Sequence, residues 1–167
     1  MDRKIKTKQN RWNFRGREAL EAFLLDNGIL KEECCIVGGL IFNAYGLREH
    51  NDLDIIVNSK NAEKLKRKYP IKNKNFEQID IDIPGEDLDV KLTIFEPFGF
   101  TNDELIYSEK YHFLYDGFKV LRLEIAFSKR LLDLSISSKN QRAREDFSIV
   151  SNYIKHKIGG VRVCSLT

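Results

Sequence analysis

The sequence is poor in the residues that mark secreted, disulfide-stabilised or membrane-spanning proteins. It has three cysteines in 167 residues, and Cys34 and Cys35 are adjacent within an apolar run. This placement favours reduced core thiols over a disulfide framework or a metal site. No apolar run approaches the roughly 18 residues that span a bilayer, and no apolar segment of the signal-peptide kind follows the basic N-terminus. We therefore expect a cytoplasmic protein with no membrane partner.

Acidic residues are nearly missing from the N-terminal segment. Residues 1–17 contain seven Lys or Arg and only Asp2 as an acid. A basic arm of this kind can contact the phosphates of a nucleotide or a nucleic acid, and a solvated terminus would have the same composition. The length suits a single domain. We expect it to comprise the arm (residues 1–16), a core (17–121) and a helical tail packed on the core (122–167).

Helical and strand-like patterns alternate along the core. Periodicity predicts helices at residues 16–27, 40–45 and 61–68, and strands at 34–37 and 53–57. Turn signals predict two hairpins, one pairing 76–83 with 88–95 and one pairing 111–115 with 118–121. Two further helical patterns, at 123–134 and 142–157, flank a Ser-rich linker at 135–138. The order predicts a mixed α/β sheet with flanking helices and a C-terminal helical tail.

The stretch GGLIFNAYGLREHNDLDIIV, residues 38–57, combines two kinds of chemistry. Asp52 and Asp54 lie two residues apart at the head of a strand, so their side chains share one face, about 7 Å apart. Hard carboxylate oxygens in this arrangement suit Mg²⁺, which completes its coordination with water and substrate phosphates. Gly38 and Gly39 follow the preceding strand and allow a tight turn where a phosphate can approach backbone N–H groups.

This combination resembles the nucleotidyltransferases of the DNA polymerase beta superfamily. In the branch with a Gly-Gly turn, the pair is followed by an apolar helix, an Arg, and Asp-x-Asp leading into an apolar strand. Gly38-Gly39, Arg48 and Asp52-Leu53-Asp54 occupy those places here. The resemblance implies a mixed-sheet nucleotidyltransferase core with a third acid on a later strand. Asp89, which precedes an apolar run, is our first choice for that acid, and Asp87 and Asp82 are the alternatives.

The resemblance also implies a reaction. A nucleoside monophosphate would pass from an NTP to an acceptor, aligned by two Mg²⁺ ions on Asp52, Asp54 and Asp89, with the third acid also able to act as general base. Gly38 and Gly39 would bind the nucleotide. Arg48 would either reach a phosphate or brace the strand that carries the aspartates.

The acceptor and two rival functions stay open at this point. A small molecule or a protein is favoured as acceptor, because a chain of this size has little room for a separate RNA-binding domain; nucleic acid could bind through the basic arm. The first rival is a related phosphosugar or phosphocholine-type transferase that also uses Asp-x-Asp. The second is a catalytically inactive regulatory or RNA-binding module with the same fold.

Overall fold

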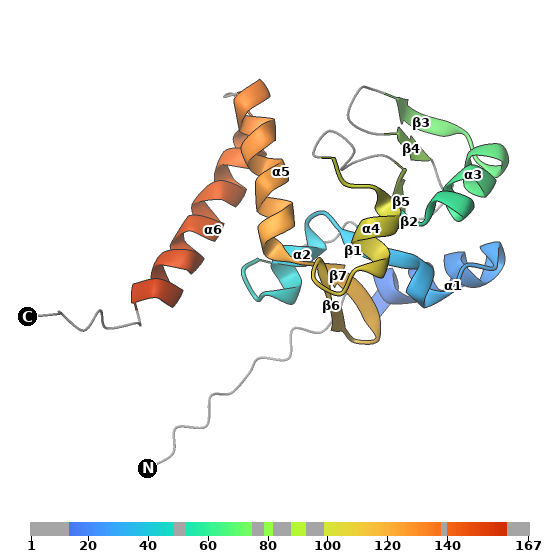
Figure 1. Cartoon of the computed structure of the whole chain (residues 1–167), viewed down its shortest axis with the longest axis horizontal. Coiled ribbons are helices and arrows are strands. Elements are labelled where there is room, and N and C mark those ends of the chain that lie inside the picture. The colour runs from blue at the N-terminus through green and yellow to red at the C-terminus, as the bar shows by residue number, and fades with distance from the viewer. Residues whose placement is uncertain are drawn as a thin grey trace, which may run out of the picture.

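The computed structural model describes residues 14–48, 53–74, 79–81, 88–92, 99–137 and 140–159, which form a mixed α/β fold (Figure 1). Its first elements are α1 (Phe14–Asn27), the single-turn η1 (Lys31–Glu33), β1 (Cys34–Val37), α2 (Leu40–Ala44), β2 (Leu53–Val57), α3 (Ser59–Lys68) and β3 (Ile71–Lys74). They are followed by β4 (Ile79–Ile81), β5 (Leu88–Lys91), α4 (Asn102–Tyr107), β6 (His112–Tyr115), β7 (Phe118–Leu121), α5 (Leu123–Ile136) and α6 (Gln141–Gly159). The expected mixed sheet, flanking helices and helical tail are confirmed.

In the part of the chain that the structure describes, seven strands form one sheet in the order β3-β4-β5-β2-β1-β7-β6. β2 runs antiparallel to β1 and parallel to β5, and β1 runs parallel to β7. The central strands β5, β2 and β1 are consequently paired on both sides. Any side chain at the end of β2 therefore has neighbours from two other strands.

Alternation along β2 gives the sheet one apolar face and one mixed face. Leu53, Ile55 and Val57 are buried on the first face, and Asp54 and Ile56 belong to the second. The buried core that the apolar residues build is large and continuous, running through α1, the central strands, α4 and β7. It holds the acid-bearing end of β2 in place.

The helices form two groups. Figure 1 shows α1 and α3 on the same side of the molecule as β3 and β4, whereas α5 and α6 lie side by side on the opposite side. Asn58 caps α3, since its side-chain oxygen accepts a hydrogen bond of 2.9 Å from the backbone N–H of Asn61. α6 packs on α5, which in turn contacts α2, so the helical pair reaches the sheet through α5 and α2.

Several boundaries differ from the sequence expectation. α1 begins at Phe14 and α3 at Ser59, and α5 continues through Ser135 and Ile136, so the predicted start of the linker at residue 135 was wrong. The strand β3, the single 3₁₀ turn η1 and the helix α4 were not predicted. Both hairpin pairings are confirmed as antiparallel pairs, β4 with β5 and β6 with β7, while the turn at 84–85 lies outside the described residues.

The second hairpin has the turn that its sequence predicts. Asp116 and Gly117 both have positive φ, 50° and 80°, as a two-residue hairpin turn requires. Arg17 of α1 forms an ion pair with Asp116, which fixes this turn against the first helix. Because α1 starts at residue 14, it extends across the expected boundary between arm and core, and the three-part division stays a prediction. Within the described ranges, no helix combines the length and apolar character needed to cross a bilayer.

Candidate active site

Asp54 lies against the glycine turn at the end of β1. The antiparallel register pairs Val37 with Asp54, so the carboxylate reaches the turn that begins one residue later. Gly38 has φ of +70°, and a Cβ atom there would overlap Asp54 Oδ2 and lie 2.8 Å from its Cγ. The carboxylate therefore occupies the space that any other residue at position 38 would fill. Gly39 has φ of −68°, which any residue adopts, so its backbone conformation does not require glycine.

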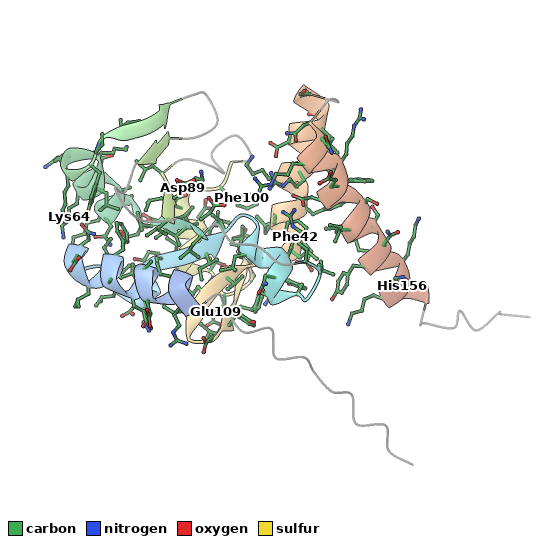
Figure 2. The ribbon with its side chains drawn as sticks, turned by 180° about the vertical axis from the view of Figure 1, so that it is seen from behind. Phe42, Lys64, Asp89, Phe100, Glu109 and His156 are labelled. Atoms are coloured by element: carbon green, nitrogen blue, oxygen red, sulfur yellow. The ribbon has the colours of Figure 1, made fainter. Side chains whose placement is uncertain are left out.

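Asp89 lies beside Asp54 on the neighbouring strand. In the parallel pair of β2 and β5 the two aspartates are in register, so their side chains project from the same face of the sheet. In the view of Figure 2, Asp89 lies between Lys64 of α3 and Phe42 of α2. The structure thus brings two of the predicted site residues together. Asp52 and the alternative third acids Asp82 and Asp87 lie outside the described residues, and the roles of all these acids as ligands stay predictions.

Lys91 completes the described part of this cluster. It follows Asp89 by two positions on β5, so it faces the same side, and its Nζ lies 3.4 Å from Asp89 Oδ2 and 3.6 Å from Asp54 Oδ1. The lysine is only 9% exposed. The two carboxylates therefore already share a cation, which offsets the repulsion expected between neighbouring negative groups. The sequence does not single out Lys91, because it is one polar residue among the apolar residues of this strand.

The donor set fits a hard divalent cation. Oxygens of Asp54 and Asp89 lie 3.6 and 3.4 Å from the same Lys91 Nζ, and Gly38 leaves room for the Asp54 carboxylate. Over the ranges described, no three His, Cys, Asp or Glu side chains cluster as metal ligands. A third protein ligand would have to come from outside those ranges, and Asp52 is the residue that the motif predicts.

Arg48 contacts the helical tail. Its Nη2 lies 3.0 Å from Oδ1 of Asp146 on α6, and its guanidinium lies 5.0 Å from the centre of the Phe42 ring. Asp146 is fully buried, and its Oδ2 lies 2.8 Å from Nε of Arg130 on α5. One buried carboxylate therefore joins the loop before β2 to both tail helices. The predicted nucleotide contact of Arg48 stays a prediction.

The two adjacent cysteines are unsuited to nucleophilic chemistry. Cys34 and Cys35 are both free thiols buried in β1. Burial raises the pKa of Cys34 to about 12, and burial likewise raises the pKa of Cys35. Since the thiolate is the reactive form, these side chains are core residues, as the sequence predicts.

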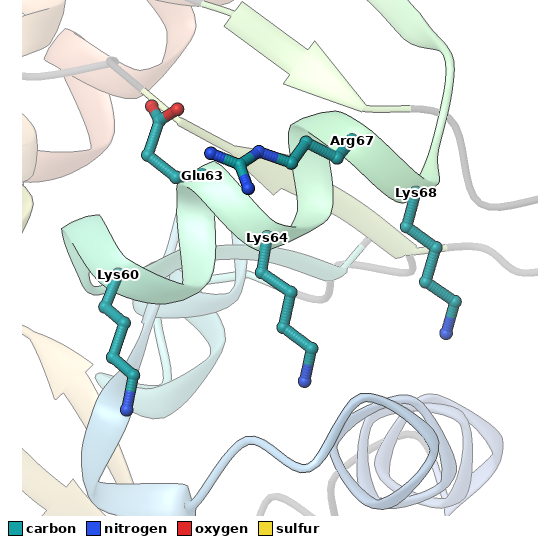
Figure 3. Close-up of a pocket in the computed structure, with 5 residues that line it drawn as sticks. All are labelled: Lys60, Glu63, Lys64, Arg67 and Lys68. Carbon is teal, nitrogen blue, oxygen red and sulfur yellow. The ribbon is translucent and has the colours of Figure 1, made fainter.

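A second concave surface lies along α3 and faces the C-terminal end of α1 (Figure 3). It encloses about 480 Å³ and is lined by Lys60, Glu63, Lys64, Arg67 and Lys68. Lys64 and Lys68 donate hydrogen bonds of 2.5 and 2.7 Å to the backbone and side-chain oxygens of Asn27. With four cations and one acid, this groove repels divalent metal ions. The helix α3 that lines the groove begins after the C-terminal end of β2, whereas Asp54 lies near the start of β2. The groove is therefore separate from the carboxylate site.

Comparison with family models and with curated proteins gives no match for this chain. Solved structures that resemble it include a proposed nucleotidyltransferase from Thermotoga maritima, 21% identical over 77% of this chain and 92% of that protein, with a TM-score of 0.44. Another is a proposed nucleotidyltransferase from Helicobacter pylori, 16% identical over 68% of this chain and 58% of that protein, with a TM-score of 0.35. At these identities the chemistry of the site has to be argued from its own residues.

Proposed function

We propose that this protein is a metal-dependent nucleotidyltransferase, which moves a nucleoside monophosphate from an NTP to an acceptor and releases pyrophosphate. The observation that supports this most is the seating of the Asp54 carboxylate against Gly38, with Asp89 in register on the next strand. In the motif that the sequence resembles, these are the positions of the phosphate turn and of two metal-binding acids. The geometry brings all three within one corner of the sheet.

Each residue would have a defined part in the reaction. Asp54 and Asp89, with Asp52 as predicted from the motif, would hold Mg²⁺, and the ion would supply charge neutralisation on the triphosphate. The turn at Gly38 and Gly39 would allow a phosphate to lie close to the backbone. The third acid, Asp89 in this proposal, would also accept the proton of the attacking hydroxyl.

The acceptor is proposed from the remaining surface. We favour a small molecule or a protein side chain, as expected from the sequence, with nucleic acid as the alternative. Labelled transfer products distinguish these classes directly, because the label from an α-labelled NTP follows the acceptor through separation by size and by nuclease or protease treatment.

Pyrophosphate release from each NTP in the presence of Mg²⁺ tests the reaction. Asp54→Asn should lower the rate more than about 100-fold, since even residues that only orient metal ligands commonly cost 10- to 100-fold. Asp26→Asn is a matched control, because Asp26 is an exposed acid on α1 outside this site. Consumption of a CDP-linked donor without pyrophosphate release would instead identify the related phosphosugar or phosphocholine-type transferase. Nucleotide or RNA binding that survives Asp54→Asn, with no turnover in the unmodified protein, would identify an inactive module.

A further inference from the structure

The α3 groove, lined by Lys60, Glu63, Lys64, Arg67 and Lys68, carries positive charge that the carboxylate site does not use. It encloses about 480 Å³, and its four cationic residues are all exposed. Lys60, Lys64 and Lys68 recur at every fourth residue of the helix, so they form a row along one of its faces. Figure 3 shows these three side chains pointing from α3 toward α1. The row therefore presents an ammonium group about every 6 Å along the helix axis.

A buried asparagine holds two of these ammonium groups in place. Asn27, the last residue of α1, is 2% exposed, and its Nδ2 donates a hydrogen bond of 2.8 Å to the backbone oxygen of Phe23. Its Oδ1 accepts a hydrogen bond from Lys68 Nζ, and its backbone oxygen accepts one from Lys64 Nζ. Both acceptors are neutral, so the lysines lose freedom of movement and keep their full charge. Because these side chains are already ordered, an anion that binds them loses less affinity to side-chain entropy.

The acids around the groove leave the row of lysines unneutralised. Glu63 is the one acid of the lining, and its Oε1 lies 2.6 Å from Nζ of Lys66. Figure 3 shows Glu63 on the side of α3 where Arg67 also lies, away from the three lysines. The pKa of Glu33 is lowered first by a hydrogen bond from a backbone N–H and only last by the charge of Lys60. Over the ranges that the structure describes, no carboxylate lies within 4 Å of the four lining cations.

A row of ordered cations suits a row of phosphates. A nucleic-acid strand carries one negative charge per nucleotide, and Lys side chains can contact its phosphates without reading the bases. The row runs about 12 Å from Lys60 to Lys68, so a single phosphate would meet only part of it. A flat bilayer fits a concave surface poorly, and none of the lining residues is an apolar one that could enter lipid. These features favour a nucleic-acid strand over a free phosphate or a membrane.

We propose that the α3 groove binds one strand of a nucleic acid through its phosphates. Lys60, Lys64 and Lys68 contact successive phosphates, and Asn27 orders the last two of these lysines for that contact. This binding goes beyond the proposed transfer reaction and does not depend on it. It is also distinct from phosphate contacts by the basic arm, because every residue that it uses lies on α3 or at the end of α1.

The salt dependence of oligonucleotide binding tests the proposal. The full chain is titrated onto a fluorescent oligo(U) strand of about 12 nucleotides, and fluorescence anisotropy gives the affinity between about 50 and 200 mM salt. Each phosphate contact on a single strand adds about 0.7 to the slope of log K against log salt. Lys60→Gln should therefore reduce the slope by about 0.7, and Lys60→Gln combined with Lys64→Gln by about 1.4.

The control is a variant with the same loss of charge elsewhere. Lys155→Gln combined with Lys157→Gln removes two exposed lysines of α6, which Figure 1 shows on the opposite side of the molecule from α3. Its slope should equal that of the unmodified protein. Lys60 has no hydrogen bond or ion pair within the described residues, so the single variant decides the question even if the double variant at Lys60 and Lys64 fails to fold.

Three outcomes would overturn the proposal. The first is an equal reduction of the slope in the control variant and in the double variant at Lys60 and Lys64, because binding would then follow net charge alone. The second is an unmodified protein that does not bind the oligonucleotide. The third is binding to phosphatidylserine vesicles that needs Lys60 and Lys64, together with oligonucleotide binding that does not. Each outcome is read from binding, so it leaves the proposed nucleotidyl transfer to its own test with Asp54→Asn.

Discussion

Replacement of Gly38 by alanine should damage the fold and the site together. Gly38 has φ of +70°, and a left-handed backbone costs a residue with a side chain about 1–2 kcal/mol. The new Cβ would also overlap the Asp54 carboxylate, and forcing an atom into a packed position typically costs a further 1–3 kcal/mol, on the order seen for overpacked cores. We expect a total loss of about 2–5 kcal/mol in the free energy of unfolding.

Gly117→Ala supplies the matched control. Gly117 has a similar φ of +80°, but a Cβ there would have no atom within 4 Å. It should therefore lose only the backbone part, about 1–2 kcal/mol, and the difference between the variants isolates the contact with Asp54. Urea denaturation measures both losses, and Mn²⁺ titration shows whether the carboxylate has moved. Equal destabilisation of the two variants, with normal Mn²⁺ binding in Gly38→Ala, would refute the reasoning.

Three further predictions concern groups outside the carboxylate cluster. Hydrogen bonds from the Leu30 backbone N–H and then from the Asn61 and Asn58 side chains lower the pKa of Glu33. Its stabilising contribution should be complete above its unfolded pKa near 4.5 and disappear as pH falls through the lower folded value. Urea denaturation at a series of acid pH values should show this loss of unfolding free energy in the native chain and a smaller loss in Glu33→Gln. An equal loss in both proteins would contradict the prediction. Asp146→Asn should cost about 3 kcal/mol or more by leaving two arginines without their buried partner, whereas Glu145→Gln on the exposed side of the same helix should cost under about 0.5 kcal/mol; equal losses on urea unfolding would argue against the buried ion cluster. Cys34 and Cys35 should resist a thiol reagent at pH 8 in the folded protein and react in guanidinium, and labelling of either in the native state, located by mass spectrometry, would contradict their burial.

The sequence predicts the centre of this fold better than its edges. β1 and β2 are short, continuously apolar or nearly so, and bounded by glycine or polar residues, so their pattern has one interpretation. β3 is Ile-Lys-Asn-Lys, with a single apolar residue, and it forms by pairing with β4 rather than from its own preference. α4 is six residues long, too short for periodicity to identify, although Thr101 and Glu104 form a capping box that could have revealed it.

The residues of the candidate site also differ in how well the sequence predicts them. A linear motif predicted Gly38 and Asp54, because the contact between them needs only two adjacent strands and the turn that follows the first. The choice of Asp89 over its alternatives had no such support, since strand register is decided by tertiary pairing. Lys91 could not be assigned to the cluster from the sequence, because its contact with Asp54 depends on the parallel pairing of β2 and β5.

The sheet order also has a consequence for how the chain folds. β1 and β2 are consecutive strands joined by a connection that contains α2, so bringing Asp54 to Gly38 closes a much smaller segment of chain than pairing with a distant strand does. The other side of β1 pairs with β7, where Ile36 meets Val120 from much later in the chain. Until β7 arrives during synthesis, the apolar strand β1 presents an open edge that another chain could extend. The glycine and aspartate would thus be in place early, while the strand that carries them still awaits its last neighbour.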